Sequence, residues 1–288
     1  MLYECHGHIM LDGIAYKGAA ERHEHGVDEA FVRNNLKTCA DAGITYYRDG
    51  GDKHMASVYA RRIAAEYGID YRTPAFIIHK RGHYGQMFGR AFDTIREYIE
   101  LVREAARLGA DFVKITASGL LKFAAGGVVD GPFSTEAELR QMVDAAHGEG
   151  FAVMVHANGP ESIKRAAEAG ADSIEHGYYM DKAALRIMAQ TGAVWVPTAA
   201  TAAGLIGSGK YDDGMLERIL EGHKAALLDA VEAGVPVACG SDAGAACVPQ
   251  GAGTLLELRI LEELGIDPVH GNESIRERFR RGGAREMC

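Results

Sequence analysis

One local pattern recurs seven times along this 288-residue chain. A segment with helical character ends at a glycine, and a short β-branched or aromatic run begins one or two residues later. Glycine suits this place because the residue after a helix often takes a left-handed backbone conformation, which costs glycine little energy. The pattern therefore predicts seven helix-to-strand connections, at Gly43, Gly68, Gly109, Gly150, Gly170, Gly192 and Gly234.

The segments before these glycines have the spacing of amphipathic helices. Before Gly109, apolar residues fall at i, i+3, i+4 and i+7: Tyr98, Leu101, Val102 and Ala105. Thr135 and Glu138 form a capping-box pattern, which predicts the start of the helix that ends at Gly150. Helices therefore alternate with short strands along the chain.

With a first strand expected at Leu2–Cys5, the seven connections give eight strands separated by helices. Such alternation predicts a parallel sheet with right-handed crossovers, and the count of eight favours a closed barrel. No glycine-rich dinucleotide motif follows the first strand, which disfavours the open sheet of dinucleotide-binding proteins. We predict a single (β/α)8 TIM barrel over residues 1–288, with residues 271–288 as a last helix and a frayed end.

The overall charge and the cysteines restrict the function classes. A formal net charge of -9 disfavours nucleic-acid binding and docking on an anionic membrane. The five cysteines lack CxxC spacing, and the first residues lack the basic and apolar parts of a signal peptide. We therefore expect a cytoplasmic protein with reduced cysteines. A homo-oligomer is compatible with the sequence, although no stripe of residues identifies an interface.

Residue types that commonly bind metals lie at the ends of several predicted strands. In a barrel of this kind the chemistry lies at the carboxyl ends of the strands. Each residue alone has a plain structural role available, such as helix capping by an aspartate or solvent contact by a lysine. Together they supply imidazole and carboxylate ligands at converging strand ends, which predicts a divalent metal site. The residues are His6, His8, Lys114, His156, His176 and Asp242.

At these residues the sequence resembles the amidohydrolase superfamily, and within it the branch that holds imidazolonepropionase and the Xaa-Pro dipeptidase-like enzymes. The resemblance spans almost the whole chain. The stretches that carry it are residues 6–8, 43–51, 112–119, 155–158, 174–177 and 240–243.

The resemblance implies two divalent ions, with Zn²⁺ expected. His6, His8 and Asp242 would hold the first ion, and His156 and His176 the second. An N-carboxylated Lys114 would bridge them, because an ammonium group cannot act as a ligand. Burial of a lysine in an apolar strand lowers its pKa and lets the neutral amine react with CO₂.

The resemblance also implies a reaction. A hydroxide between the metals would attack an amide carbonyl, and Asp242 would be the catalytic residue that accepts the proton and returns it to the leaving group. We expect cleavage of a C–N bond in a small carboxylate-bearing molecule: a dipeptide, an N-acyl amino acid or a cyclic amide. Alternatives are hydrolysis of a lactone, ester or phosphoester, a mononuclear deaminase or decarboxylase, and a non-catalytic metal-binding barrel.

Two features depart from the family pattern. Many members carry a β-sandwich beside the barrel, and with the first strand expected at Leu2 we expect the sandwich to be absent. The fifth-strand motif reads His156-Ala157-Asn158, where a second histidine is commoner, so one further imidazole is absent.

Loops after the strands are expected to choose the substrate. The loop with His79, Arg81, His83 and Tyr84 is basic and aromatic, and it predicts either a clamp for a substrate carboxylate or a solvated surface loop. The phenols of Tyr178 and Tyr179 predict support for an oxyanion, or plain packing.

Two other segments bear on the site. The segment around Lys122, Gly126 and Gly127 is expected to fold over the site as a lid. Arg48 and Asp49, which end the second strand, are expected to form an internal ion pair at the barrel mouth.

Overall fold

The computed structural model describes residues 1–281 and shows a closed barrel of parallel strands. Neighbouring strands follow one another in chain order, and every pairing in the barrel is parallel. The strands are β1 (Leu2–Gly7), β2 (Ile44–Asp49), β3 (Asp70–Arg72), β4 (Ile77–Lys80), β6 (Val113–Thr116), β9 (Val153–Ala157), β10 (Ser173–His176) and β11 (Val194–Val196).

The third strand of the barrel is interrupted. β3 pairs with β2 and β4 pairs with β6, so two short strands share one position in the barrel. Between them lies Pro74, which has no N–H for a ladder, and Ala75 with a φ of 65°. The interruption leaves the Ala75 carbonyl available for a hydrogen bond from the Asp52 N–H, at 3.0 Å.

Extended backbone around Val237 takes the eighth position. Trp195 N–H donates to Pro236 O, and Cys5 N–H donates to Cys239 O, each at 2.8 Å. These bonds join the segment to β11 on one side and to β1 on the other, which closes the barrel. The predicted (β/α)8 fold is confirmed, although the expected eighth strand has only a single bridge at Val237.

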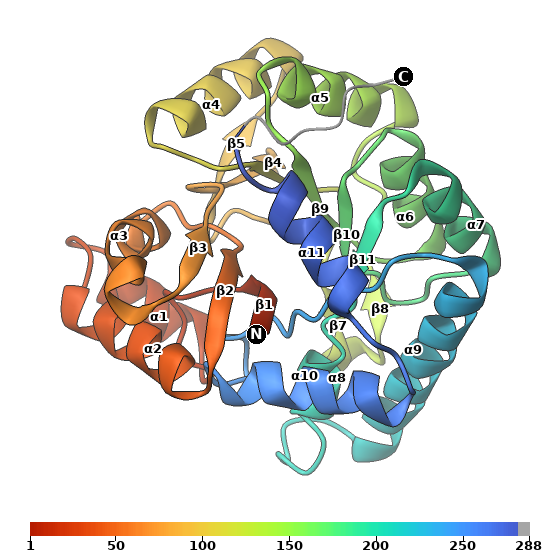
Figure 1. Cartoon of the computed structure of the whole chain (residues 1–288). Coiled ribbons are helices and arrows are strands. Elements are labelled where there is room, and N and C mark those ends of the chain that lie inside the picture. Colours follow the sequence, from red (N-terminus) through yellow and green to blue (C-terminus); the bar gives the residue numbers. More distant parts are fainter. Residues whose placement is uncertain (282–288) are drawn as a thin grey trace.

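Helices form a ring around the strands (Figure 1). The longer ones are α2 (Glu29–Asp41), α3 (Ala56–Ile63), α4 (Ile95–Arg107), α5 (Glu136–Gly148), α6 (Pro160–Glu168), α7 (Lys182–Thr191), α9 (Asp213–Ala233) and α10 (Ala252–Glu263). Shorter helices are α1 (Tyr16–Arg22), α8 (Ala200–Ala203) and the 3₁₀ turns at Ala64–Tyr67 and Phe123–Ala125.

The predicted helix ends and caps are confirmed. All seven glycines of the repeated pattern have a positive φ, between 63° and 93°. Thr135 and Glu138 form a complete capping box at the start of α5. The sequence pattern thus reflects left-handed residues that end helices before barrel strands.

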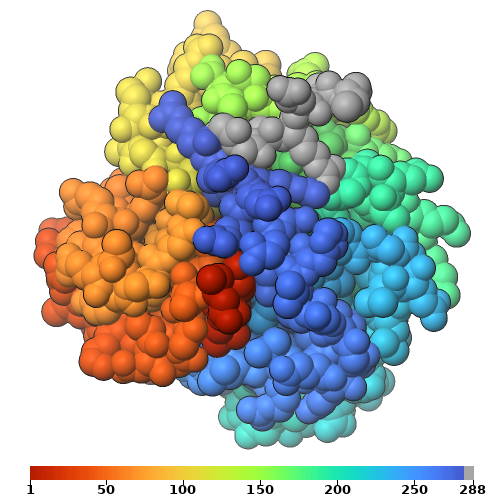
Figure 2. Space-filling view, in the orientation of Figure 1, coloured from red at the N-terminus to blue at the C-terminus, as the bar shows by residue number. Residues whose placement is uncertain are grey.

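Helix α11 (Val269–Arg278) lies across the end of the barrel where the strands begin (Figure 1). Ile275 and Phe279 are fully buried against the barrel interior, and the rings of Phe279 and Phe112 lie 5.2 Å apart. In the space-filling view α11, drawn in blue, fills the centre of this face (Figure 2). The expected last helix is present and begins at Val269, and residues 282–288 lie outside the described residues.

The remaining strands are additions to the barrel. β5 (Gly89–Phe92) runs parallel to β4, and β7 (Leu121–Lys122) pairs with β8 (Val128–Val129) as a short antiparallel hairpin. Residues 1–281 contain no separate β-sandwich. Within the same residues, no helix is long and apolar enough to cross a membrane.

Candidate metal centre

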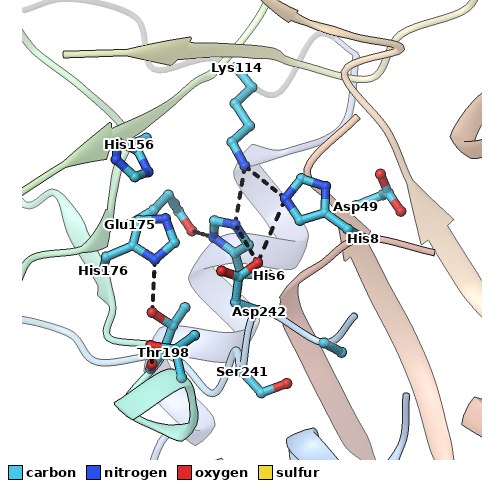
Figure 3. A network of polar contacts seen from close by, with 12 residues as sticks. His6, His8, Asp49, Lys114, His156, Glu175, His176, Thr198, Ser241 and Asp242 are labelled. Carbon is cyan, nitrogen blue, oxygen red and sulfur yellow. Dashed lines mark hydrogen bonds and ion pairs between the residues drawn. The ribbon is translucent and has the colours of Figure 1, made fainter. Parts of the chain in front are cut away.

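Four of the predicted ligands meet at the carboxyl ends of β1 and β6 (Figure 3). Lys114 Nζ lies 3.1 Å from His6 Nε2 and 3.5 Å from His8 Nε2. Asp242 Oδ1 lies 3.8 Å from His6 Nε2 and 3.7 Å from His8 Nε2. One ligand atom from each of His6, His8 and Asp242 lies within 4.8 Å of the other two. These three side chains fit a divalent ion with nitrogen and oxygen ligands.

The other two predicted ligands lie beside this group. The ring centroids of His156 and His176 are 4.5 Å apart, and those of His6 and His176 are 4.8 Å apart. The structure therefore brings all six predicted ligands into one cluster (Figure 3).

Three of the imidazoles have one ring nitrogen fixed by a neighbour, which leaves the other for a ligand. Glu175 Oε2 lies 2.6 Å from His6 Nδ1, and Thr198 Oγ1 lies 2.8 Å from His176 Nδ1. His156 Nε2 lies 3.0 Å from the Gly119 carbonyl, to which it can only donate. Metal-binding histidines commonly have such a partner, because it sets the tautomer and the ring orientation. The arrangement fits a metal centre.

Two of the predicted ligands have strained backbone. His176 and Asp242 have φ values of 66° and 61°, in the left-handed region that non-glycine residues rarely adopt. Trp195 Nε1 donates to His176 O at 2.9 Å, and Asp242 N–H donates to His6 O at 2.7 Å. Such strain occurs at functional sites, where surrounding contacts hold the residue in place.

Burial disfavours the charged forms of the histidines and of the lysine in this cluster. It lowers the pKa of Lys114 to about 8, against the opposing effect of the Asp242 and Glu175 carboxylates. It lowers the pKa of His156 to about 3, and it also lowers the pKa values of His6, His8 and His176. Neutral imidazole is the form that binds a metal, and a neutral amine is the form that reacts with CO₂.

Comparison with known proteins agrees with this arrangement. The model of the amidohydrolase family matches residues 6–271. The chain belongs to the amidohydrolase family. Ochratoxinase of Aspergillus niger is 27% identical over 232 residues, which cover 78% of this chain and 45% of that protein. The chain thus spans about half the length of this curated relative.

Solved structures of related proteins share the fold. The structure of a Xaa-Pro dipeptidase with bound methionine is 25% identical, has a TM-score of 0.75, and matches 95% of this chain and 72% of its own. The structure of A. niger ochratoxinase is 21% identical, has a TM-score of 0.76, and matches 98% of this chain and 72% of its own. The predicted resemblance to the Xaa-Pro dipeptidase-like branch is confirmed.

A cavity of about 440 Å³ adjoins the cluster. His156, His176 and Asp242 lie at its inner end, and Leu121 to Ala125 of the hairpin segment form one wall. The segment predicted to be a lid therefore lies beside the predicted metal ligands.

Two of the predicted substrate residues lie at the site. Tyr178 lines the cavity, and its hydroxyl pairs with Thr201 Oγ1 at 2.8 Å. The ring of Tyr84 lies 4.7 Å from that of His156, and burial raises the pKa of its phenol.

The other predicted substrate residues point elsewhere. Arg81 forms an exposed ion pair with Asp93 at 2.7 Å, and His83 stacks on Phe133 at 4.3 Å. His79 is buried, with Nδ1 3.1 Å from the Lys80 carbonyl. Tyr179 donates to Gly127 O at 2.8 Å. None of these four lines the cavity beside the predicted metal ligands.

The sequence did not assign the residues that hold the ligands. Glu175, Thr198 and the Gly119 carbonyl each fix one imidazole. The position of Glu175 inside a predicted strand, directly before His176, was the available signal for it. Arg48 forms its internal ion pair with Glu175 at 2.9 Å, and not with Asp49.

Asp49 instead binds backbone N–H groups at the barrel mouth. It accepts bonds from Ile9 N–H at 2.8 Å and Gly51 N–H at 2.6 Å. The Tyr71 hydroxyl also donates to it, at 2.6 Å. The carboxylate thus ties the start of two loops to β2.

Proposed function

We propose that this protein is a metal-dependent hydrolase that cleaves the C–N bond of a small amide at a binuclear centre. The observation that carries the proposal is the position of Lys114, whose amine lies between His6 and His8 in a group of neutral imidazoles. An amine cannot bridge two cations, whereas its carbamate, formed with CO₂, is an anionic ligand with two oxygens. Lys114 would be N-carboxylated and would join the His6–His8–Asp242 group to the His156–His176 pair.

A pair of divalent cations, with Zn²⁺ favoured by the nitrogen-rich ligands, would supply a nucleophilic water at neutral pH and polarise the amide carbonyl. Asp242 would take a proton from the attacking water and pass it to the leaving nitrogen. Burial raises the pKa of Asp242 to about 6 in the metal-free protein. A bound cation would favour the ionised carboxylate, which is the form that accepts a proton.

Amide hydrolysis is favoured over the other reactions by the similarity to the Xaa-Pro dipeptidase structure, which covers 95% of this chain. The substrate would be a small molecule, since the cavity beside the ligands holds about 440 Å³.

Metal content tests the proposal directly. Protein purified without chelator in bicarbonate buffer is expected to hold close to two zinc equivalents, and Lys114→Ala is expected to lose most of this metal. Lys182→Ala is the matched control, because this lysine is 71% exposed and pairs with Asp229 on the outer surface. One equivalent that is unchanged in Lys114→Ala would exclude the bridged centre. Full amide turnover by the Asp242→Asn variant would exclude Asp242 as the proton carrier.

A further inference from the structure

The wall of the cavity beside the predicted metal ligands is mainly apolar. Besides Lys122 and Thr201, it is formed by apolar side chains that include Leu121, Phe123, Ala125, Leu205 and Ala245, with the aromatic rings of Tyr16 and Tyr211. We propose that this cavity binds a neutral, apolar substituent of the amide substrate, an aryl or branched alkyl group. The proposal rests on the proposed function, since it identifies what the hydrolase holds while its amide bond meets the metal ligands.

The cavity offers little to a substrate carboxylate. Among the described residues that line it, Lys122 is the single lysine and no arginine is present. The Lys122 ammonium already pairs with Asp130. The cationic loop residue Arg81 pairs with Asp93 and does not line the cavity. A substrate carboxylate bound against this wall would lose its hydration and gain no cationic partner. Such desolvation carries a large free-energy cost.

Several polar groups of the cavity lie beside the predicted ligands. Asn158 and Tyr178 lie with His156 and His176 beside the ligands, and the Asn158 side chain donates to the Gly119 carbonyl at 3.2 Å. Another part of the wall is aromatic, with the rings of Phe123 and Tyr211 5.6 Å apart. A substrate with an amide at one end and an apolar group at the other matches this division.

Apolar side chains also line the cavity where it meets solvent. Leu120 and Tyr211 line the cavity and are 39% and 36% exposed. Exposed apolar side chains around a site are typical of surfaces that bind apolar ligands. The volume of about 440 Å³ is sufficient for a phenyl or bicyclic group together with the amide.

Two matched pairs of amides test the proposal on the zinc-loaded full chain. 3-Phenylpropanamide and succinamate differ only in a phenyl group or a carboxylate on the acyl side, and both release ammonia. N-Benzylacetamide and N-acetylglycine differ in the same way on the amine side, and both release acetate. For at least one pair, the phenyl compound is expected to have a kcat/KM about tenfold higher or more, as filling an apolar pocket commonly gives.

A variant at the wall tests the location. Ala125 is exposed, lines the cavity and is not a ligand, so Ala125→Arg introduces a cation without disturbing the core. It is expected to move the ratio of phenyl to carboxylate turnover about tenfold toward the carboxylate compounds. Ala125→Leu is the control for size, and it is expected to keep the phenyl preference. Equal ratios in Ala125→Arg and Ala125→Leu would overturn the placement of the apolar group against this wall.

Calorimetric titration of the same four amides separates this proposal from the proposed function. Phenyl compounds that bind about tenfold more tightly but are not cleaved would support the apolar cavity and contradict amide hydrolysis. Cleavage with equal or better binding of the carboxylate compounds would support amide hydrolysis and overturn the apolar specificity. No binding of any of the four would also overturn the apolar specificity.

Discussion

Glu175 Oε2 lies 2.6 Å from Nδ1 of His6, and both side chains are fully buried. The carboxylate is itself held by Arg48, whose Nη2 lies 2.9 Å from each of its oxygens. Arg48 of β2, Glu175 of β10 and His6 of β1 thus contact one another in series across the barrel. The series ends at a predicted metal ligand. The orientation of His6 depends on two residues that do not face the cavity.

Glu175→Gln is expected to weaken zinc binding by about 10- to 100-fold, because the neutral amide is a poorer acceptor for the His6 N–H. Competition with a chromogenic chelator measures the affinity. Glu66→Gln is the control, since its carboxylate is 58% exposed in a surface ion pair with Arg33. Unchanged affinity in Glu175→Gln would show that packing alone orients the imidazole.

Arg48→Met is expected to lower the free energy of unfolding by about 3–5 kcal/mol, because it leaves the Glu175 carboxylate buried without its cation. The double variant Arg48→Met/Glu175→Gln is expected to recover part of this loss, since no buried charge remains. Urea unfolding of the metal-free proteins measures both changes. A double variant less stable than Arg48→Met would contradict this account.

The barrel and its ligands could be predicted because each depends on local chemistry. A glycine such as Gly150, with a φ of 83°, ends a helix whatever lies around it. In a parallel barrel the strand ends meet at one face, so His156 and His176 had to approach His6. The position of a residue along its strand was therefore sufficient to place it in the cluster.

Features that depend on distant partners could not be predicted. Arg48 and Glu175 lie 127 residues apart in sequence, and no local pattern pairs them. Arg81 turns away from the cavity because β5 brings Asp93 beside it, which only the tertiary structure shows. Gly234 predicted where the eighth strand begins, but that it would form only a single bridge, at Val237, has no sequence signal.

Gly50→Ala is expected to remove most of the bound zinc while the protein stays folded. A Cβ at residue 50 would lie 2.2 Å from His8 Cε1 and 2.7 Å from Lys114 Nζ, so both side chains would have to move. Gly148→Ala is the matched control, because a Cβ there meets nothing within 4 Å and lies in helix α5. Elemental analysis after purification measures the metal. Wild-type zinc content in Gly50→Ala would show that the ligand cluster tolerates the displacement.

His223 is expected to lower the free energy of unfolding of the metal-free protein as the pH falls. Its ring is 2% exposed and stacks on Tyr178 at 4.2 Å, and burial lowers its pKa from 6.5 to about 4. As the pH falls through 6.5, the unfolded chain binds a proton that the folded protein does not bind until about pH 4. This histidine therefore removes stability between these pH values and has no further effect below them.

His223→Gln tests this dependence, and its amide retains a donor for the Pro197 carbonyl, which lies 3.0 Å from His223 Nε2. Between pH 7.5 and pH 5 the variant is expected to gain about 2 kcal/mol relative to the wild type, because it lacks the histidine proton uptake on unfolding. Urea unfolding at a series of pH values measures the difference, in which the contributions of the other titrating groups cancel. A difference that stays constant with pH would show that the His223 ring is protonated as readily in the folded protein as in the unfolded chain.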